Sequence, residues 1–388
     1  MNRPAAESDF DREIDRTGTA SLKWQRYQDR DILPLWVADT DFLSPPAVLA
    51  ALRERVAHGV FGYTVPPPEL IAAVGDHLAQ TYRWQVDPDW LVWLPGLVSG
   101  LAVACRAFAG PGDGVLTSTP IYPPFLTCPP AMERHLQTAP LVRRHGRWEF
   151  DWDAFAAAID RTTRLLLFCS PHNPCGRIWQ RAELEQLAEN CLRHDLVICS
   201  DEIHNQLLLD REPHLPTALI APEIAARTVT LLAPSKTYNI AGLGCSYAVI
   251  PDQVLRRRFQ RAAAMIVPHV NALGYTAAAA AYRDGGSWLA AQLDYLRRGR
   301  DLIESAVAAL TGVHMTHVEA TYLAWLDCRA LHLDDPVAHF EAHGLGFQAG
   351  REFGLRGFIR WNFGTTHTRL RAALDRFQTA CAAAPGRG

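Results

Sequence analysis

Short apolar runs alternate with helical stretches between residues 47 and 265, and this alternation limits the possible folds more than any other feature. The runs are rich in β-branched residues and leucine, as buried strands are. The expected strands cover residues 115–118, 165–169, 196–200, 228–232 and 245–250, and the expected helices cover residues 47–58, 68–82, 97–108, 151–159 and 181–194. Because strands separated by helices form βαβ units, we expect an α/β fold with a mostly parallel central sheet sandwiched by helices.

The two ends of the chain have a different pattern from this middle part. The N-terminal segment is extended and rich in Pro, Asp and Trp, while the C-terminal part begins with a long amphipathic helix, followed by strand-like pieces and a closing helix. We therefore predict a large domain and a smaller α/β domain built from both chain ends. The predicted parts are an N-terminal segment over residues 1–46, the large domain over 47–286 and the C-terminal small domain over 287–388.

Charge and composition exclude several classes of partner. A net charge of −3 gives no electrostatic reason to expect nucleic acid or an anionic membrane as a partner. No stretch approaches the roughly 20 apolar residues that span a bilayer, and the N-terminus lacks the apolar run of a signal peptide. The nine cysteines lie in apolar runs and form no Cys-x-x-Cys pair, so we predict a cytoplasmic protein with no metal site.

Lysine is almost absent from this chain. Of its 38 basic residues, only Lys23 and Lys236 are lysines, and all the others are arginines. An arginine stays protonated in a protein, whereas a lysine amine with a lowered pKa can form an imine with an aldehyde. Chance alone can leave one lysine in place, so the surroundings of Lys236 decide its role.

Three of the predicted strands lead directly to polar residues. In chain order they run into Asn173, into Asp201 and into the pair Ser235 and Lys236. Residues just past the carboxyl ends of parallel strands line the ligand crevice of such a sheet. We therefore expect an amide, a carboxylate and a lysine to meet at one edge of the sheet.

This combination suits pyridoxal 5′-phosphate (PLP), attached through its aldehyde to Lys236. The carboxylate of Asp201 would keep the pyridine nitrogen protonated, which makes the ring an electron sink. Asn173 would donate to the phenolic oxygen beside the substrate, and Tyr122 would cover one face of the ring. We predict that Lys236, Tyr122 and Asp201 are the catalytic residues.

The phosphate of this cofactor needs backbone N–H groups at the start of a helix. Gly96, Leu97 and Val98 open a predicted helix, and Ser235 would add its hydroxyl group. We also count His204 among the cofactor-binding residues, although a histidine beside a strand end more often has a structural role.

Several motifs together resemble a known family. The run Pro-Ser-Lys-Thr-Tyr-Asn-Ile-Ala-Gly-Leu at 234–243 is similar to the cofactor-lysine signature of fold type I PLP enzymes. Other runs resemble the cystathionine β-lyase-like (C–S lyase) branch of the aminotransferase class I/II superfamily. These runs are Trp-Val-Ala-Asp-Thr-Asp-Phe at 36–42, Phe-Gly-Tyr at 61–63, Pro-His-Asn-Pro-Cys-Gly-Arg-Ile-Trp at 171–179 and Ser-Asp-Glu-Ile-His at 200–204. The motifs follow the order of the family over about residues 22–364.

The resemblance implies further site residues. Arg360 matches the arginine that binds the α-carboxylate of the substrate, and Ala38 and Asp39 would lie near the substrate entrance. Ile203 would pack against the ring face opposite Tyr122. Tyr63 matches a tyrosine that reaches the phosphate of the neighbouring subunit, which implies a homodimer.

The implied reaction is β-elimination from an S-substituted L-cysteine, with release of a thiol, pyruvate and ammonia. An aminotransferase, or an enzyme that deaminates or decarboxylates a tailored biosynthetic amino acid, would use the same residues. A regulatory or binding protein that retains the PLP fold is an alternative of another class. Two departures leave the substrate open: Thr40 stands where relatives usually carry Met, and residues 362–367 read Asn-Phe-Gly-Thr-Thr-His where many relatives have Cys-Pro-Arg. Both are expected near the substrate side chain.

Overall fold

A computed structural model describes residues 9–385 and contains an eight-stranded sheet as its largest element. In spatial order its strands are β2 (Leu91–Leu94), β9 (Ser246–Val249), β8 (Thr228–Leu232), β7 (Val197–Asp201), β6 (Thr163–Cys169), β3 (Gly114–Thr119), β4 (His135–Arg144) and β5 (Arg147–Phe150). Strands β8 to β4 run parallel, and the strands toward both edges pair antiparallel. The predicted, mostly parallel sheet is confirmed.

Apolar side chains on both faces of the sheet explain why its strands are nearly continuous hydrophobic runs. Val115 and Leu165 face one layer of helices, and their neighbours Leu116 and Leu166 face the other, because successive strand residues point to opposite sides. The first layer contains α4 (Leu97–Phe108), α5 (Pro123–Ala131) and α9 (Gln253–Ala263). The second contains α6 (Trp152–Ala157), α7 (Arg181–Arg193) and α8 (Pro222–Ala225).

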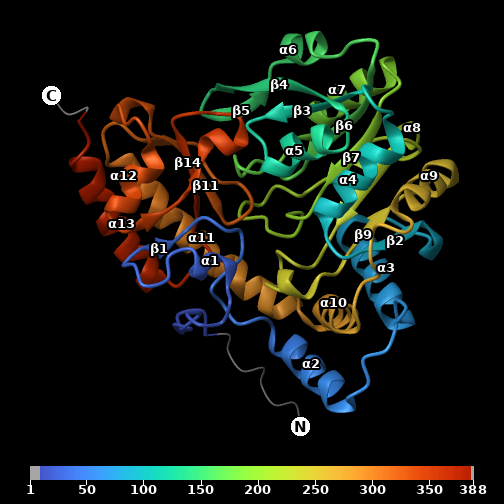
Figure 1. Cartoon of the computed structure of the whole chain (residues 1–388), viewed down its shortest axis with the longest axis horizontal. Helices are drawn as coiled ribbons and strands as arrows, with labels where there is room; N and C mark the ends of the chain where they lie inside the picture. The colour runs from blue at the N-terminus through green and yellow to red at the C-terminus, as the bar shows by residue number, and fades with distance from the viewer. Residues whose placement is uncertain (1–8, 386–388) are drawn as a thin grey trace.

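A second, four-stranded antiparallel sheet lies beside the first one (Figure 1). Its strands are β10 (His314–Met315), β11 (Leu323–Asp327), β14 (Phe358–Asn362) and β13 (Gln348–Ala349), and the helices of this part are α11 (Gly286–Ala308), α12 (Pro336–Ala342) and α13 (His367–Ala382). The N-terminal strand β1 (Leu33–Pro34) pairs in parallel with β12 (Leu345–Gly346). The two chain ends therefore meet here, while the predicted domain boundaries stay predictions.

The remaining helices and 3₁₀ turns are distributed over both parts of the molecule. They are the helices α1 (Leu22–Gln25), α2 (Pro46–His58), α3 (Pro68–Tyr82) and α10 (Ala272–Asp284), and the 3₁₀ turns η1 (Pro88–Trp90), η2 (Thr217–Leu219), η3 (Ala241–Leu243), η4 (Arg329–Leu331) and η5 (Gly350–Phe353). Among the helices of residues 9–385, none has both the length and the apolar character of a membrane span.

The sequence patterns missed β4, β5 and α5. Strand β4 lies toward an edge of the sheet, so buried and exposed side chains alternate along it and polar residues interrupt the apolar signal. Helix α5 contains Pro129 and Pro130, and because proline is unfavourable inside a helix the segment carries no helical signal in the sequence. Its first residue is also a proline, a position where the missing N–H has no helical partner to lose.

Candidate active site

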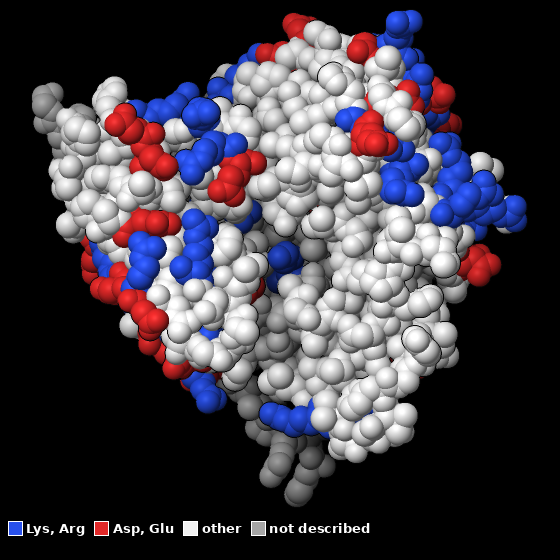
Figure 2. Space-filling model, in the orientation of Figure 1, with Lys and Arg blue, Asp and Glu red and all other residues white. Residues whose placement is uncertain are grey.

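A cavity of about 310 Å³ opens at the carboxyl ends of the parallel strands. All but two of the predicted site positions line it. They are Ala38, Gly96, Leu97, Val98, Tyr122, Asn173, Asp201, Ile203, His204, Ser235, Lys236 and Arg360. Figure 2 shows a hollow near the centre of one face of the molecule with a basic side chain in its depth.

Lys236 follows β8 and has its amine at the cavity wall. Its Nζ donates a hydrogen bond of 2.7 Å to the carbonyl oxygen of Ala38, which also accepts one of 3.0 Å from the hydroxyl of Tyr322. Burial lowers the pKa of Lys236 to about 8, although the carboxylate of Asp39 acts in the opposite direction. Because a pKa near 8 leaves a fraction of the Lys236 amine neutral at neutral pH, Lys236 can act as a nucleophile or as a base.

Asp201 ends β7 and is buried. Its carboxylate accepts a hydrogen bond of 3.1 Å from the backbone N–H of Ile203. Burial raises the pKa of Asp201 to about 7, with a smaller upward effect from Glu202 and a downward one from Lys236. A cationic group at the cavity side of this carboxylate would favour its charged form, so the environment fits a protonated ring nitrogen.

Arg360 lies on β14, is 2% exposed, and connects several walls of the cavity. Its Nη1 donates to Oδ1 of Asn173 at 3.0 Å, and its Nη2 donates to the carbonyl oxygen of Trp36 at 2.9 Å and to Oε1 of Gln348 at 2.5 Å. Burial lowers the pKa of Arg360 to about 10, so the guanidinium stays charged at neutral pH. Its buried Nε has no partner among the described residues, which leaves a donor for a carboxylate ligand.

The N-terminus of α4 forms another wall. Gly96 is its N-cap, no side chain caps the helix, and a Cβ on Gly96 would meet no atom within 4 Å. The first N–H groups of a helix have no partner within the helix, and together with the helix dipole they favour an anion. Ser235 lines the same cavity, so the predicted phosphate position is open and has donors.

Two aromatic side chains complete the cavity. Tyr122 precedes α5, its backbone N–H donates to the carbonyl of Asn173 at 3.1 Å, and burial raises the pKa of its phenol. The buried Nδ1 of His204 has no partner among the described residues, and burial lowers the pKa of this imidazole to about 3. The unpartnered ring nitrogen, together with the amide, carboxylate and lysine, fits the predicted cofactor. His172, by contrast, is not among the residues that line the cavity, and its Nε2 is hydrogen-bonded to the carbonyl of Pro120 at 2.7 Å.

Asp39 and Tyr63 are the predicted positions that do not line the cavity. The Asp39 carboxylate is hydrogen-bonded to Arg16, with distances of 3.2 and 2.9 Å. Tyr63 is fully exposed on the surface of the protomer. Their predicted roles toward the substrate and toward a neighbouring subunit stay predictions.

Other residues line the cavity that the sequence did not single out. They are Leu22, Trp36, Val37, Cys169, Ala241 and Gln348. Trp36 and Val37 lie in a motif used for the family resemblance, so a signal was present for them. Gln348 gave no signal, because only the antiparallel pairing of β13 with β14 brings it beside Arg360.

Thr40 and residues 362–367, the two places where the sequence departs from the family pattern, are in contact. Thr40 is 1% exposed, the backbone N–H of Asp41 donates to the carbonyl of Gly364 at 2.8 Å, and a Cβ on Gly364 would lie 2.7 Å from Cγ2 of Thr40. Neither residue is among those that line the cavity. The expectation that they meet the substrate side chain therefore finds no support in their positions.

Comparisons with known proteins agree with this arrangement. The crystal structure of OvoB has a TM-score of 0.95 and 45% identity, and the match covers 97% of this chain and 99% of that one. Cystalysin from Treponema denticola, whose crystal structure contains a pyridoxal 5′-phosphate cofactor, has a TM-score of 0.93 and 31% identity over 97% of this chain and 99% of its own. Cystathionine β-lyase PatB of Bacillus subtilis (strain 168) is 36% identical over 383 residues, which are 96% of this chain and 99% of PatB.

These similarities extend over the large sheet, the smaller sheet and the cavity between them. The model of the family "Aminotransferase class I and II" matches residues 30–377, which include every predicted site residue. The resemblance inferred from the motifs is confirmed, and this chain belongs to the class I and II aminotransferase family.

Proposed function

We propose that this chain is a PLP-dependent carbon–sulfur β-lyase that converts an S-substituted L-cysteine and water into a thiol, pyruvate and ammonia. The observation that carries this proposal is the meeting of the Lys236 amine, the Asp201 carboxylate and the Arg360 guanidinium in one cavity. The similarity to cystathionine β-lyase PatB and to cystalysin supports lyase chemistry over the other reactions that such a cavity can serve.

PLP, when bound, supplies an electron sink that stabilises negative charge at the α-carbon of an amino acid. Lys236 would hold it covalently, and Asp201 would face the ring nitrogen. Asn173 would donate with its NH₂ group, since its oxygen accepts from Arg360. Tyr122 and Ile203 would lie against the two faces of the ring, and the N-terminus of α4 with Ser235 would bind the phosphate.

The chain's own residues then position the substrate and move its proton. Arg360 binds the α-carboxylate and fixes the orientation of the α-carbon relative to Lys236. The neutral Nζ of Lys236 takes the α-proton, which its lowered pKa permits near neutral pH. Gln348 is hydrogen-bonded to Arg360 beside this position and limits the space for the substrate.

The proposal is tested by incubating the holoenzyme with L-cystathionine and with S-alkyl-L-cysteines. Free thiol is measured with a chromogenic disulfide, and pyruvate with a coupled reductase. Equal amounts of thiol and pyruvate are expected. Conversion of the cofactor to its amine form without pyruvate would instead support an aminotransferase and contradict the lyase proposal.

Replacement of Arg360 by lysine tests the carboxylate site. Arg360→Lys keeps a positive charge but loses the planar fork that binds a carboxylate through two hydrogen bonds, so we expect KM to rise by about 10- to 100-fold. Arg356→Lys is the matched control, because Arg356 is exposed and lies just before the same strand. Steady-state kinetics with one S-alkyl-cysteine check this, and equal KM values for both variants would contradict the assignment.

We also propose that the protein is a homodimer in which Tyr63 reaches the phosphate in the neighbouring subunit. Apolar side chains near Tyr63 support an interface, since Val60, Phe61 and Val65 are exposed in the single protomer. Tyr63→Phe removes one hydrogen bond to a charged group, so cofactor binding is expected to weaken about 10- to 100-fold. Cofactor titration followed by absorbance measures this, and sedimentation shows whether the variant remains a dimer.

A further inference from the structure

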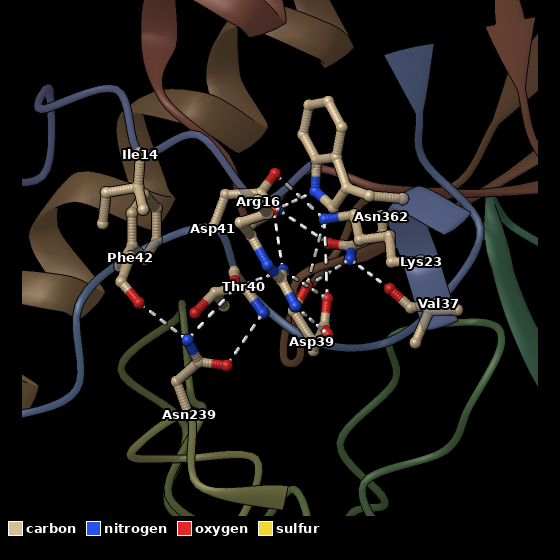
Figure 3. A network of polar contacts seen from close by, with 12 residues as sticks. Ile14, Arg16, Lys23, Val37, Asp39, Thr40, Asp41, Phe42, Asn239 and Asn362 are labelled. Atoms are coloured by element: carbon tan, nitrogen blue, oxygen red, sulfur yellow. Dashed lines mark hydrogen bonds and ion pairs between the residues drawn. The ribbon is translucent and has the colours of Figure 1, made fainter. Parts of the chain in front are cut away.

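The segment of residues 37–42 lies between strand β14 and the loop after β8 that carries Lys236 and Asn239. Side chains from both the strand and the loop hold its backbone (Figure 3). Asn239, three residues after Lys236, donates to the carbonyls of Thr40 at 3.1 Å and Phe42 at 2.7 Å. Asn362 on β14 donates to the carbonyl of Asp39 at 2.6 Å. The segment is therefore fixed with respect to both the amine and the arginine of the site.

The only two lysines of the chain bind consecutive carbonyls of this segment. Lys236 Nζ donates to the carbonyl of Ala38 at 2.7 Å, and Lys23 Nζ approaches the carbonyl of Asp39 at 3.3 Å. Lys23 is fully buried, and its Nζ lies 3.0 Å from Oδ2 of Asp41 and 3.7 Å from Oδ1 of Asp39. The buried ammonium group of Lys23 thus contacts the peptide that follows the one bound by the active-site amine.

The charged side chains that surround Asp39 and Asp41 balance one another. Arg16 lies 2.9 Å from a carboxylate oxygen of Asp39 and 2.9 Å from one of Asp41, and Figure 3 shows it between the two. Trp24 donates to Asp41 at 3.1 Å. Two cations therefore face two carboxylates, and loss of one cation would leave a buried carboxylate with insufficient compensation.

We propose that Lys23 is a positioning residue for Lys236: its ammonium group binds the carbonyl of Asp39, the next one along from the Ala38 carbonyl that receives the Lys236 amine, and neutralises the Asp39–Asp41 pair on the side away from the cavity. A lysine suits this position because a compact ammonium can contact three oxygens in a fully buried space, where a planar guanidinium is larger. This explains why a chain that uses arginine elsewhere keeps a lysine at position 23. The inference deepens the proposed function, on which its catalytic meaning rests.

The amine of Lys236 is surrounded by charged and titratable groups from several elements. They are Asp39 in the segment, Asp201 on β7, His204 after β7, Arg360 on β14 and Tyr322 before β11. Of these, Asp39 raises the pKa of Lys236 most. Loss of the Lys23 charge would make the potential at Lys236 more negative, which favours the protonated amine.

The scarcity of lysine makes a direct test possible. The full-length chain, freed of cofactor with hydroxylamine, is labelled with a trace of acetic anhydride over a range of pH, and the peptide that carries Lys236 is quantified by mass spectrometry. The midpoint of labelling against pH gives the pKa of this amine. We expect about 8 for the unmodified chain, and a midpoint about one pH unit higher in Lys23→Met.

A charge-matched variant separates positioning from plain stability. Lys23→Met with Asp41→Asn removes one cation and one carboxylate together, so the midpoint is expected to return toward that of the unmodified chain. A purely structural role for Lys23 predicts no shift in Lys23→Met, or an equal shift in both variants, and either result would overturn the inference. If Lys23→Met does not fold, Asp41→Asn is labelled instead: it removes a carboxylate and keeps both cations, so the midpoint must fall below that of the unmodified chain, and an unchanged midpoint would overturn the inference.

The outcome is independent of whether the lyase proposal holds. A shifted midpoint in a chain that releases no thiol from any S-substituted cysteine would uphold the role of Lys23 and reject the lyase reaction. An unshifted midpoint in an active lyase would reject the role of Lys23 and uphold the lyase reaction. In an active enzyme, the acidic limb of the kcat profile, which reports the groups of the enzyme–substrate complex, should follow the labelling midpoint from variant to variant.

Discussion

Replacement of Lys236 by alanine is expected to reduce thiol release by about 10⁴-fold or more. The variant loses both the group that attaches the cofactor and the base at the α-carbon. The carbonyl of Ala38 keeps the hydroxyl of Tyr322 as a donor, so the cavity wall should remain in place. Pyruvate and thiol assays measure the loss, and circular dichroism checks that the fold is unchanged.

Chemical rescue provides the control for this variant. Small primary amines that diffuse into the cavity of about 310 Å³ should restore part of the activity in proportion to the fraction of neutral amine. Tertiary amines of similar basicity cannot form an imine with the cofactor aldehyde, so they should restore less activity. Wild-type rates in Lys236→Ala without added amine would show that another residue performs this chemistry.

Replacement of Asp201 by asparagine is expected to lower kcat by about 100- to 1000-fold, with a smaller effect on KM. The change preserves size but removes the only carboxylate among the described residues that line the cavity, and with it the charge that favours a protonated ring nitrogen. The free energy of unfolding should change little or increase, because burial already raises the pKa of Asp201 to about 7 and makes its charged form unfavourable without the cofactor.

Asp195→Asn is the matched control for Asp201→Asn. Asp195 is exposed just before the opposite end of β7 and pairs at 3.1 Å with Arg227, an ion pair of the surface kind that contributes little. Its kcat should equal that of the unmodified enzyme. Similar kcat values for Asp201→Asn and Asp195→Asn would contradict the assignment of Asp201 to the ring nitrogen.

The sequence alone predicted the central part of the fold well, for a clear physical reason. Strands β3, β6, β7 and β8 are buried along most of their length, so each contains a short run of apolar and β-branched residues that a pattern can detect. Strand β4 was missed because it is polar at alternate positions, and the very short strands β1, β10, β12 and β13 have no pattern of their own. They form only because distant segments supply their partners.

The site was predictable to the extent that strand ends position it. Asn173, Asp201 and Lys236 follow neighbouring parallel strands, so their convergence was implied by the topology. Arg360, which comes from the other sheet, was assigned only through the family resemblance. Gln348 and the contact of Lys23 with the 37–42 segment depend on how short strands and irregular loops fold back on one another, which no periodic pattern encodes.

The contact between Thr40 and Gly364 has a consequence for protein engineering. A larger residue at position 364 collides with the Thr40 side chain, since even a Cβ there would approach it to 2.7 Å. A side chain can therefore be added at position 364 only if the residue at position 40 becomes smaller. The two positions should behave as one epistatic unit in any library that varies either of them, and recombination between 40 and 364 would separate matched partners.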